Sequence, residues 1–468
     1  MSEKKNREDS TVGRNNPGRD AIGAAMRFIT SITGSDFAQK YDLQPKIDRV
    51  VYQSTKSGFK TLGAANRQFK KISGSGKPER PAEEAQAAQE AAAEEKAKKL
   101  FDLTPTEDQQ MIVETVKEFA ESRLREAAYK SDHEATPPEN LVSEASELGV
   151  TMINVPEAFE GIATGEDVTT NALVAEALSY GDMGLALAVL APAGVAATLT
   201  AHGSDSQQKT YLPAFAGENV PAAAVVLAEP RPLFDARKPE TTAKREGDSL
   251  VLNGVKSFVP NAGAAELFII GVELEGNPAL VIVESDTEGL HVEADPSMGL
   301  RGAAMGRVIL KDVKVPAENI LGGASTSAED REEVYLDILR RSRLGWAALA
   351  MGTSQAVLDY VIPYVNERQA FGEPISHRQA VAFMVADIKI ELDGLRMITL
   401  RGASRADQGR GFAREAALAK TFATEKGMKI GSDGVQLLGG HGFTKEHPVE
   451  RWYRDLRAIG VAEGIVVL

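Results

Sequence analysis

A change of hydrophobic period along the chain constrains its fold more than any other sequence feature. From residue 101 to about residue 220, apolar residues recur at helical spacing, as Ile112, Val116 and Phe119 do. Between residues 221 and about 322 the chain turns to short β-rich runs separated by Gly, Asn and Pro. Long helical patterns return after residue 328. This order predicts an α+β fold with a helical domain (101–220), a central β-barrel or sheet domain (221–322) and a C-terminal four-helix bundle (323–468).

Helix starts are expected at two capping-box spacings. Thr104 is followed by Glu107, and Ser376 is followed by Gln379, each with the hydroxyl and the long side chain three residues apart. The helix after Ser376 carries one apolar stripe, made of Val381, Met384, Val385, Ile388, Leu392, Leu395 and Ile398. A stripe of this kind predicts that one face of the helix packs against a core.

The most apolar run of the chain lies at residues 184–201. It is rich in Ala and Gly and is broken by Pro192, so we expect a buried helix rather than a membrane span. In the central part, strands are expected in the runs at 249–260, 266–274, 279–285 and 307–316.

A basic extension, residues 1–77, precedes the main body. Residues 1–71 hold 14 Lys and Arg against 7 Asp and Glu, and two stretches place apolar residues on one helical face. A basic amphipathic helix binds an anionic membrane surface or a partner; a helical hairpin packed on the protein's own body is the alternative, and both stay open. Residues 78–100 are almost all Ala, Glu, Lys and Gln, which predicts a semi-rigid helical linker.

Composition excludes several kinds of site. The 468 residues include no cysteine, which excludes disulfides and thiolate metal sites, and the six histidines show no paired-ligand spacing. We therefore expect no metal. The formal net charge of −14 argues against a nucleic-acid-binding protein. A cytoplasmic location is expected, with membrane association through residues 1–71 left open.

Three motifs carry a resemblance to a known family. They are "GDSLVLNGVKSFVPNAGAAELFII" (247–270), "RQAFGEPISHRQAVAFMVADI" (368–388) and "QLLGGHGFTKEHPVERWYRDLRAIGVAEG" (436–464). In this order and at this spacing, residues 101–468 resemble the acyl-CoA dehydrogenases. The resemblance implies that family's fold and an FAD-dependent oxidation of the α,β C–C bond of a fatty acyl-CoA thioester.

The resemblance also implies the catalytic residues. Glu463 stands at the position of the family's catalytic base, and its backbone N–H would be one donor to the thioester oxygen. A carboxylate base in an apolar slot suits this chemistry, since desolvation raises its pKa. The alternative base position is filled by Ser342, which cannot act as a base. Arg343 resembles the family's arginine on the substrate side, and pairing with a neighbouring acid is the other reading of that residue.

Cofactor contacts follow from the same resemblance. Arg368, Phe371 and Gln379 match residues that hold the flavin diphosphate and adenine across a subunit interface, and Gln436 and Gly440 match the other side of that site. An arginine fork suits a diphosphate, and glycine lets the backbone approach a ligand. Outside the resemblance, core packing explains Phe371 and a helix C-cap explains the glycine. The resemblance further implies a tetramer, formed by copies of this chain or with a paralogue, and an electron-acceptor flavoprotein as partner.

Several positions depart from the family pattern around the expected flavin. Ala228 and Pro260 each lack a hydroxyl that the family uses at the flavin ring, and the family's Trp-Ile-Thr triplet appears here as Phe258, Val259 and Pro260. Leu233 and Phe234 add bulk in the loop 228–235, and Ile465 replaces a threonine after the base, which removes a hydroxyl expected near the diphosphate. Two hypotheses follow: a flavoenzyme that oxidises acyl-CoA, or a flavin-poor family member that assembles with an active paralogue.

Overall fold

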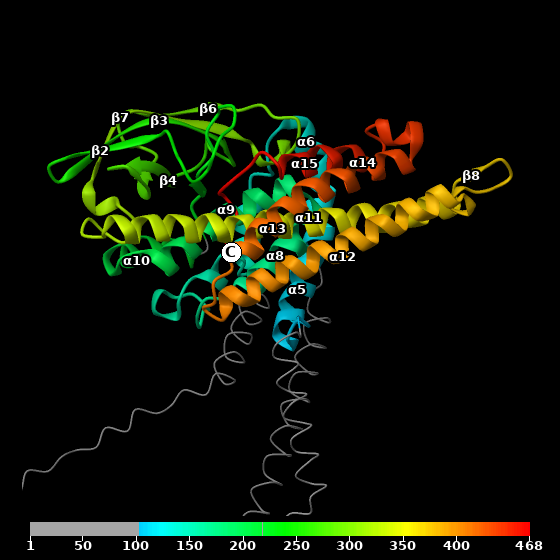
Figure 1. Cartoon of the computed structure of the whole chain (residues 1–468), viewed down its shortest axis with the longest axis horizontal. Coiled ribbons are helices and arrows are strands. Elements are labelled where there is room, and N and C mark those ends of the chain that lie inside the picture. The colour runs from blue at the N-terminus through cyan, green and yellow to red at the C-terminus, as the bar shows by residue number, and fades with distance from the viewer. Residues whose placement is uncertain (1–102, 218) are drawn as a thin grey trace, which may run out of the picture.

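The structure is a computed structural model that describes residues 103–217 and 219–468. The predicted extension (1–77), its membrane contact through residues 1–71 and the predicted linker (78–100) lie outside the described residues. The described part confirms the α+β class, with helices first, a curled sheet next and long helices last (Figure 1).

Helices make up the first part of the described chain. They are α5 (Glu107–Phe119), α6 (Arg125–Glu134), α7 (Leu141–Glu147), α8 (Val168–Gly181), α9 (Met183–His202) and α10 (Asp205–Tyr211). The capping box at the start of α5 is formed by Thr106 and Gln109, so the predicted box of Thr104 and Glu107 is wrong. Thr104 with Glu107 and Thr106 with Gln109 have the same spacing. The capping box forms at the pair whose hydroxyl meets the N3 amide of the helix.

The apolar helix α9 is a core helix. It is the one helix among the described residues that is long and apolar enough to cross a membrane, but 89% of its apolar window is buried inside the protein. Its N-cap, Asp182, accepts a hydrogen bond from the Leu185 amide. The expectation of a buried helix is confirmed.

The central part is one seven-stranded sheet. Its strands are β1 (Ala223–Val226), β2 (Thr242–Glu246), β3 (Ser249–Val259), β4 (Leu267–Leu274), β5 (Asn277–Glu284), β6 (Leu290–Ala294) and β7 (Gly306–Pro316). The order is β1-β4-β2-β3-β7-β6, with β5 paired to β4. The four strands expected from sequence are β3, β4, β5 and β7. The other three are short or strongly charged, and their pattern alone did not reveal them.

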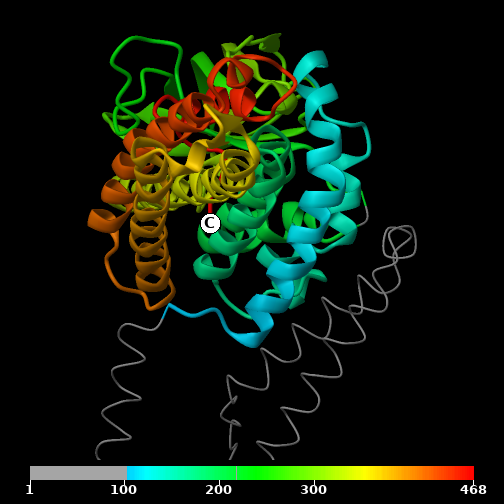
Figure 2. The same cartoon turned by 90° about the vertical axis from the view of Figure 1, so that its right-hand side faces the viewer.

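The last part is helical and begins with the longest helix. Its elements are α11 (Ala328–Glu367), β8 (Gln369–Ala370), β9 (Glu373–Pro374), α12 (Gln379–Asp407), α13 (Ala413–Phe422), α14 (Met428–Leu437) and α15 (Val449–Ala458). α11 passes beneath the sheet and then runs beside α12 to the β8–β9 hairpin at the far end of the molecule (Figures 1 and 2).

The start of α12 differs from the prediction, whereas its apolar stripe agrees with it. Ser376 lies in a short 3-10 turn before the helix, and Arg378 is the N-cap without a side-chain hydrogen bond, so the predicted capping box there is wrong. The stripe itself is confirmed. Ile388, Leu392 and Leu395 are buried, and the other four stripe residues pack partly buried against the same core.

Candidate active site

Glu463 follows α15 on a segment where the three parts of the molecule meet. The next residue, Gly464, forms a β-bridge with Val226 of β1. Its carbonyl oxygen accepts hydrogen bonds from Ser342 Oγ (2.7 Å) and Trp346 Nε1 (2.9 Å), both on α11. Ser342, which sequence had only excluded as a base, therefore anchors the backbone beside the expected base.

The Glu463 carboxylate is paired with Arg343 of α11. Arg343 Nη2 lies 3.0 Å from Glu463 Oε1, and Arg343 Nε lies 3.2 Å from the same oxygen. The glutamate side chain is 14% exposed and the arginine side chain 24% exposed. Arg343 therefore does pair with a neighbouring acid, which was the second of its two readings. That acid is Glu463, the candidate base.

A second cation, Lys420 of α13, lies behind this pair. Its Nζ is 3.9 Å from Glu463 Oε2, donates a hydrogen bond to the Ala462 carbonyl and lies 5.5 Å from the centre of the Trp346 ring. Burial lowers the pKa of Lys420 to about 8, although the Glu463 carboxylate acts in the opposite direction. The expectation that the base lies in an apolar slot is therefore wrong, because two cations flank the Glu463 carboxylate. Sequence reasoning missed Lys420, whose only signal is a lone lysine in the apolar run "AALAKTFA".

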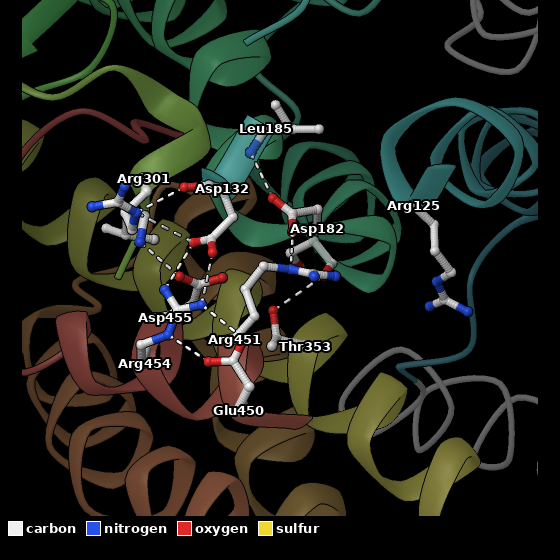
Figure 3. A network of polar contacts seen from close by, with 12 residues as sticks. Arg125, Asp132, Asp182, Leu185, Arg301, Thr353, Glu450, Arg451, Arg454 and Asp455 are labelled. Carbon is white, nitrogen blue, oxygen red and sulfur yellow. Dashed lines mark hydrogen bonds and ion pairs between the residues drawn. The ribbon is translucent and has the colours of Figure 1, made fainter. Parts of the chain in front are cut away.

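An ion-pair network fixes α15 and with it the segment that carries Glu463 (Figure 3). Arg451 Nε lies 3.0 Å from Asp182 Oδ2, and both nitrogens of the Arg454 fork reach Asp132 at 2.8 and 2.9 Å. Asp455 accepts a hydrogen bond from the Leu300 amide at 2.6 Å. Burial and the neighbouring Asp182 raise the pKa of Asp455. The network joins α15 to α6, α9 and the loop before β7.

A buried ion pair shapes the loop of the sheet domain that was expected to face the flavin. Glu229 accepts hydrogen bonds from Lys256 Nζ (2.9 Å) and from the Thr241 amide (2.9 Å) and hydroxyl (2.8 Å). Burial alone would raise the pKa of Glu229, but Lys256 and the backbone hydrogen bonds outweigh it and lower the pKa to about 2. Lys256 also donates to the Leu227 carbonyl, so the pair ties β3 to the start of the loop.

The expected flavin-ring residues lie beside this pair. Ala228 and Pro260 are buried, Phe258 is half-buried with a left-handed backbone (φ +55°), and the Ser257 amide donates to the Ala228 carbonyl at 3.0 Å. The buried Ser257 hydroxyl has no hydrogen-bond partner among the described residues. Leu233 is 98% exposed at the loop tip, so its side chain does not fill the space beside these strands.

The other expected cofactor residues lie at the β8–β9 end of the helices. Arg368, Phe371, Gln436 and Gly440 line one cavity of about 460 Å³. Gln379 does not line it, although its neighbours Arg378 and Ala380 do. Ile465, expected near the diphosphate, is absent from this cavity and is buried elsewhere.

The two groups of candidate residues lie far apart within one chain. Arg343 and Arg368 belong to α11 and its C-cap, and at 1.5 Å per residue the helix separates them by roughly 37 Å. Glu463 contacts Arg343 within α11, whereas the cavity lies at the C-terminal end of that helix.

Family comparisons agree with the three-part architecture. Residues 106–219, 224–313 and 333–465 match the N-terminal, middle and C-terminal domains of acyl-CoA dehydrogenases. Together these matches span most of the described chain.

Individual relatives are similar over nearly their whole length. The chain is 35% identical over 373 residues to a probable acyl-CoA dehydrogenase, YngJ, of Bacillus subtilis, covering 78% of this chain and 96% of that protein. It is 32% identical to the human mitochondrial short-chain specific acyl-CoA dehydrogenase, covering 76% and 87%.

Solved structures share the fold. Butyryl-CoA dehydrogenase from Megasphaera elsdenii superposes with a TM-score of 0.70 at 29% identity, covering 78% of this chain and 96% of that one. A chain solved in work on the electron transferring flavoprotein of Acidaminococcus fermentans gives 0.71 at 30% identity, with the same coverage. This chain therefore belongs to the acyl-CoA dehydrogenase family of oxidoreductases, which act on CH–CH bonds.

Proposed function

We propose that this chain is an FAD-dependent acyl-CoA dehydrogenase in which Glu463 removes the α-proton of an acyl-CoA thioester. The observation that carries the proposal is the Glu463 carboxylate itself. It is held by Arg343 where helix, sheet and C-terminal segment meet, yet its side chain keeps some exposure. A base needs a fixed position and an open side from which substrate can approach.

The residues around Glu463 have separate tasks in this proposal. Arg343 orients the carboxylate with two N–H donors on one oxygen, which leaves acceptor capacity on the other for the substrate proton. Ser342 and Trp346 fix the Gly464 carbonyl, and thereby hold the Glu463 backbone whose N–H would donate to the thioester oxygen. Bound FAD supplies the hydride acceptor for the β-hydrogen.

The cavity at the β8–β9 end fits the dinucleotide part of FAD. Arg368 and Arg378 bring two guanidinium groups suited to a diphosphate, and Phe371 offers an exposed ring. A Cβ built on Gly440 would meet no atom within 4 Å, so the backbone there is open to a ligand. Gln436 lines the same cavity, and Gln379 begins the adjoining helix.

The ring end of FAD is assigned to Ala228, Phe258 and Pro260. Ala228 and Pro260 bring no hydroxyl, and Pro260 has no backbone N–H. The Ser257 hydroxyl, whose residue donates its amide to Ala228, has no partner within the described part of the chain and is a donor that a ligand or a water would satisfy. The sheet domain thus offers the Ser257 hydroxyl in the region where Ala228 and Pro260 lack the two hydroxyls of the family pattern.

Two observations support assembly of this chain with further subunits. The roughly 37 Å between Arg343 and Arg368 means that one chain does not bring both groups to one cofactor. In addition, α12 exposes Phe383, Ile390 and Met397, seven residues apart on one face, although its other face is already packed on the core. Such a second apolar face is typical of an interface. We propose a homotetramer, with a heteromer formed with a paralogue as the alternative, a cytoplasmic location, and a flavoprotein as electron acceptor.

Flavin reduction tests the proposed reaction. The full chain, purified with FAD, is titrated anaerobically with butyryl-CoA while the flavin absorbance is followed. We expect bleaching in the wild type and a loss of roughly 10²–10⁴-fold in its rate in Glu463→Gln, since general-base catalysis contributes about that much. Glu333→Gln, an exposed glutamate of α11, is the matched control and should bleach normally.

A flavin-poor subunit is the second candidate function, favoured by the missing hydroxyls at Ala228 and Pro260. It predicts a colourless protein that takes up no added FAD. Equal bleaching in Glu463→Gln and wild type would instead remove Glu463 from its proposed role while keeping the flavin.

A further inference from the structure

Lys420 of α13 is a nearly buried lysine whose ammonium group holds a backbone carbonyl. Its side chain is 12% exposed, and its Nζ donates a hydrogen bond to the Ala462 carbonyl oxygen. The carboxylate oxygen with which it pairs, Glu463 Oε2, lies 3.9 Å away, which is beyond hydrogen-bond distance. The hydrogen bond of this ammonium group therefore goes to the peptide before the candidate base, and its attraction to the base acts only through space.

Lys256, the buried lysine of the sheet domain, is bound differently. Its Nζ donates to Glu229 Oε1 at 2.9 Å and to the Leu227 carbonyl at 3.2 Å. There a carboxylate takes a hydrogen bond from the cation that it neutralises, as is usual for a buried charge. Lys420 leaves Glu463 Oε2 without such a hydrogen bond and gives it to the backbone instead.

The Ala462 carbonyl belongs to the same peptide unit as the Glu463 N–H. A trans peptide unit is planar, so its C=O and its N–H point in opposite directions. Because Lys420 holds the carbonyl on the side of α13, it also fixes the direction of the N–H on the opposite side. Among the residues that the structure describes, none accepts a hydrogen bond from the Glu463 amide. This N–H is therefore both oriented and available to a ligand.

The backbone is anchored on both sides of Glu463. Lys420 holds the carbonyl before it, and Ser342 Oγ and Trp346 Nε1 hold the Gly464 carbonyl after it. The Lys420 ammonium group also lies 5.5 Å from the centre of the Trp346 ring, so the two anchors contact each other. Since the segment is held from α11 and from α13, the Glu463 N–H has little freedom to turn away.

The charge of Lys420 also strengthens this donor. A cation that binds an amide oxygen draws electron density toward that oxygen and thereby polarises the N–H of the same unit. Burial lowers the pKa of Lys420 to about 8, so most molecules still carry the charge at pH 7.

We propose that Lys420 is a positioning residue of the acyl-CoA reaction: through the Ala462 carbonyl it orients and polarises the Glu463 N–H that donates to the thioester oxygen. The inference rests on the proposed function. When the α-proton moves to the Glu463 carboxylate, negative charge develops on the thioester oxygen, and a fixed N–H stabilises that charge. Lys420 acts through the peptide unit and contacts neither the proton nor the substrate.

Two variants and one control test this. Lys420→Met removes the ammonium group and keeps an unbranched side chain, and Lys420→Gln is a second uncharged variant that carries the test if the first does not fold. Lys426→Met is the matched control. Lys426 also pairs with a carboxylate, Glu391 at 2.6 Å, and lies 5.9 Å from the centre of the Phe422 ring, but its ion pair reaches α12. Circular dichroism establishes that each variant is folded.

The rate of flavin reduction by butyryl-CoA is measured at pH 7 on the FAD-loaded proteins. We expect it to fall roughly 10-fold or more in Lys420→Met and Lys420→Gln, and to stay unchanged in Lys426→Met. The loss should be smaller than the roughly 10²–10³-fold that follows outright removal of an oxyanion donor, because the N–H itself remains.

The thioester carbonyl gives a second readout that does not depend on turnover. Butyryl-CoA, isotopically labelled at that carbonyl, is bound to FAD-loaded Glu463→Gln, which keeps the backbone N–H and lacks the base. Infrared difference spectroscopy records the C=O stretching band, which moves to lower frequency as the hydrogen bond to the oxygen strengthens. Adding Lys420→Met should move the band back toward its position in the free thioester, and adding Lys426→Met should not.

An unchanged rate in the folded Lys420 variants overturns the inference. A lower rate with an unmoved carbonyl band overturns it as well, since Lys420 would then act on the Glu463 carboxylate through space and not on the N–H. Both outcomes leave flavin reduction by the wild type intact. Failure of the proposed function looks different: the wild type itself does not reduce its flavin with butyryl-CoA, and the inference falls with it.

Discussion

Two clusters of arginine and carboxylate groups flank α15, and they are built differently. In the network of Figure 3, Asp182 receives Arg451 and the Leu185 amide, and each Asp132 oxygen receives a nitrogen of Arg454. Side chains from the helical domain and from α15 close that network from both sides. At Glu463, by contrast, Arg343 binds mainly one oxygen, and the other is 3.4 Å from Arg343 Nε and 3.9 Å from Lys420 Nζ.

The difference separates a structural cluster from a candidate site. Arg451 and Asp182 are 9% and 4% exposed, so no ligand reaches them, whereas Arg343 and Glu463 keep a partly open side. Buried charge by itself therefore does not indicate catalysis, because buried ion pairs also hold helices in register. A buried carboxylate oxygen with few hydrogen-bond donors from the protein, such as Glu463 Oε2, is a better indicator of a catalytic site.

The largest effect should come from breaking the closed network. Arg451→Leu leaves Asp182 and Asp455 buried near each other without their shared cation, and we expect unfolding free energy to fall by about 3–5 kcal/mol. Urea denaturation followed by circular dichroism measures this. Lys389→Gln, which removes an exposed pair with Asp393, is the control and should cost less than about 0.5 kcal/mol.

Arg343→Gln should lower the rate of flavin reduction more than it lowers stability. We expect the rate of flavin reduction to fall about 10–100-fold, because a charged hydrogen bond of roughly 1.5–3 kcal/mol no longer orients the base. Unfolding free energy should fall less than in Arg451→Leu, because Lys420 Nζ, 3.9 Å from Glu463 Oε2, remains to compensate the carboxylate. A stability loss as large as that of Arg451→Leu with an unchanged rate would show that both clusters are structural.

The pH dependence of stability probes Asp455. Because its pKa is raised in the folded protein, the folded state keeps a proton that the unfolded chain loses above the ordinary value of 3.8. Stability should therefore fall as pH rises from that value toward neutrality, by at most about 1.4 kcal/mol per pH unit. Asp455→Asn should flatten this slope in denaturation series between pH 4 and 7; parallel slopes would contradict the assignment.

The smallest effect is expected at Lys420. Its pKa is lowered to about 8 in the folded protein from the ordinary lysine value of 10.5, so between these values the unfolded chain binds the extra proton. Wild-type stability should rise with pH in that window relative to Lys420→Met. The slope has the same upper limit of about 1.4 kcal/mol per pH unit as at Asp455, but the pH window between the two pKa values is narrower, so the total change should be smaller. Thermal melts at pH 8 and pH 10 make the comparison, and equal differences at both would refute it.

Particular residues show how far sequence reasoning reached. Period and turn residues located α9, α12 and four of the seven strands, because burial on one face leaves a repeat in the sequence. The capping boxes at Thr104 and Ser376 were misplaced, because spacing alone does not tell which hydroxyl meets the helix amide. Glu463 and Arg343 were singled out by motif, but their contact was one of two open readings. Lys420 was missed, since a lone lysine in an apolar helix gives no sign of what lies across from it.

The sequence by itself determined the order of helices, sheet and helices, the family, and the residue types available for chemistry. Those follow from local periodicity and from motifs within short stretches. Tertiary structure alone decided that Arg343 and Lys420 flank Glu463, that Arg368 lies at the far end of α11, and that Lys420 holds the Ala462 carbonyl. The physical reason is that contacts between residues far apart in the chain depend on how whole helices pack, which no local pattern records.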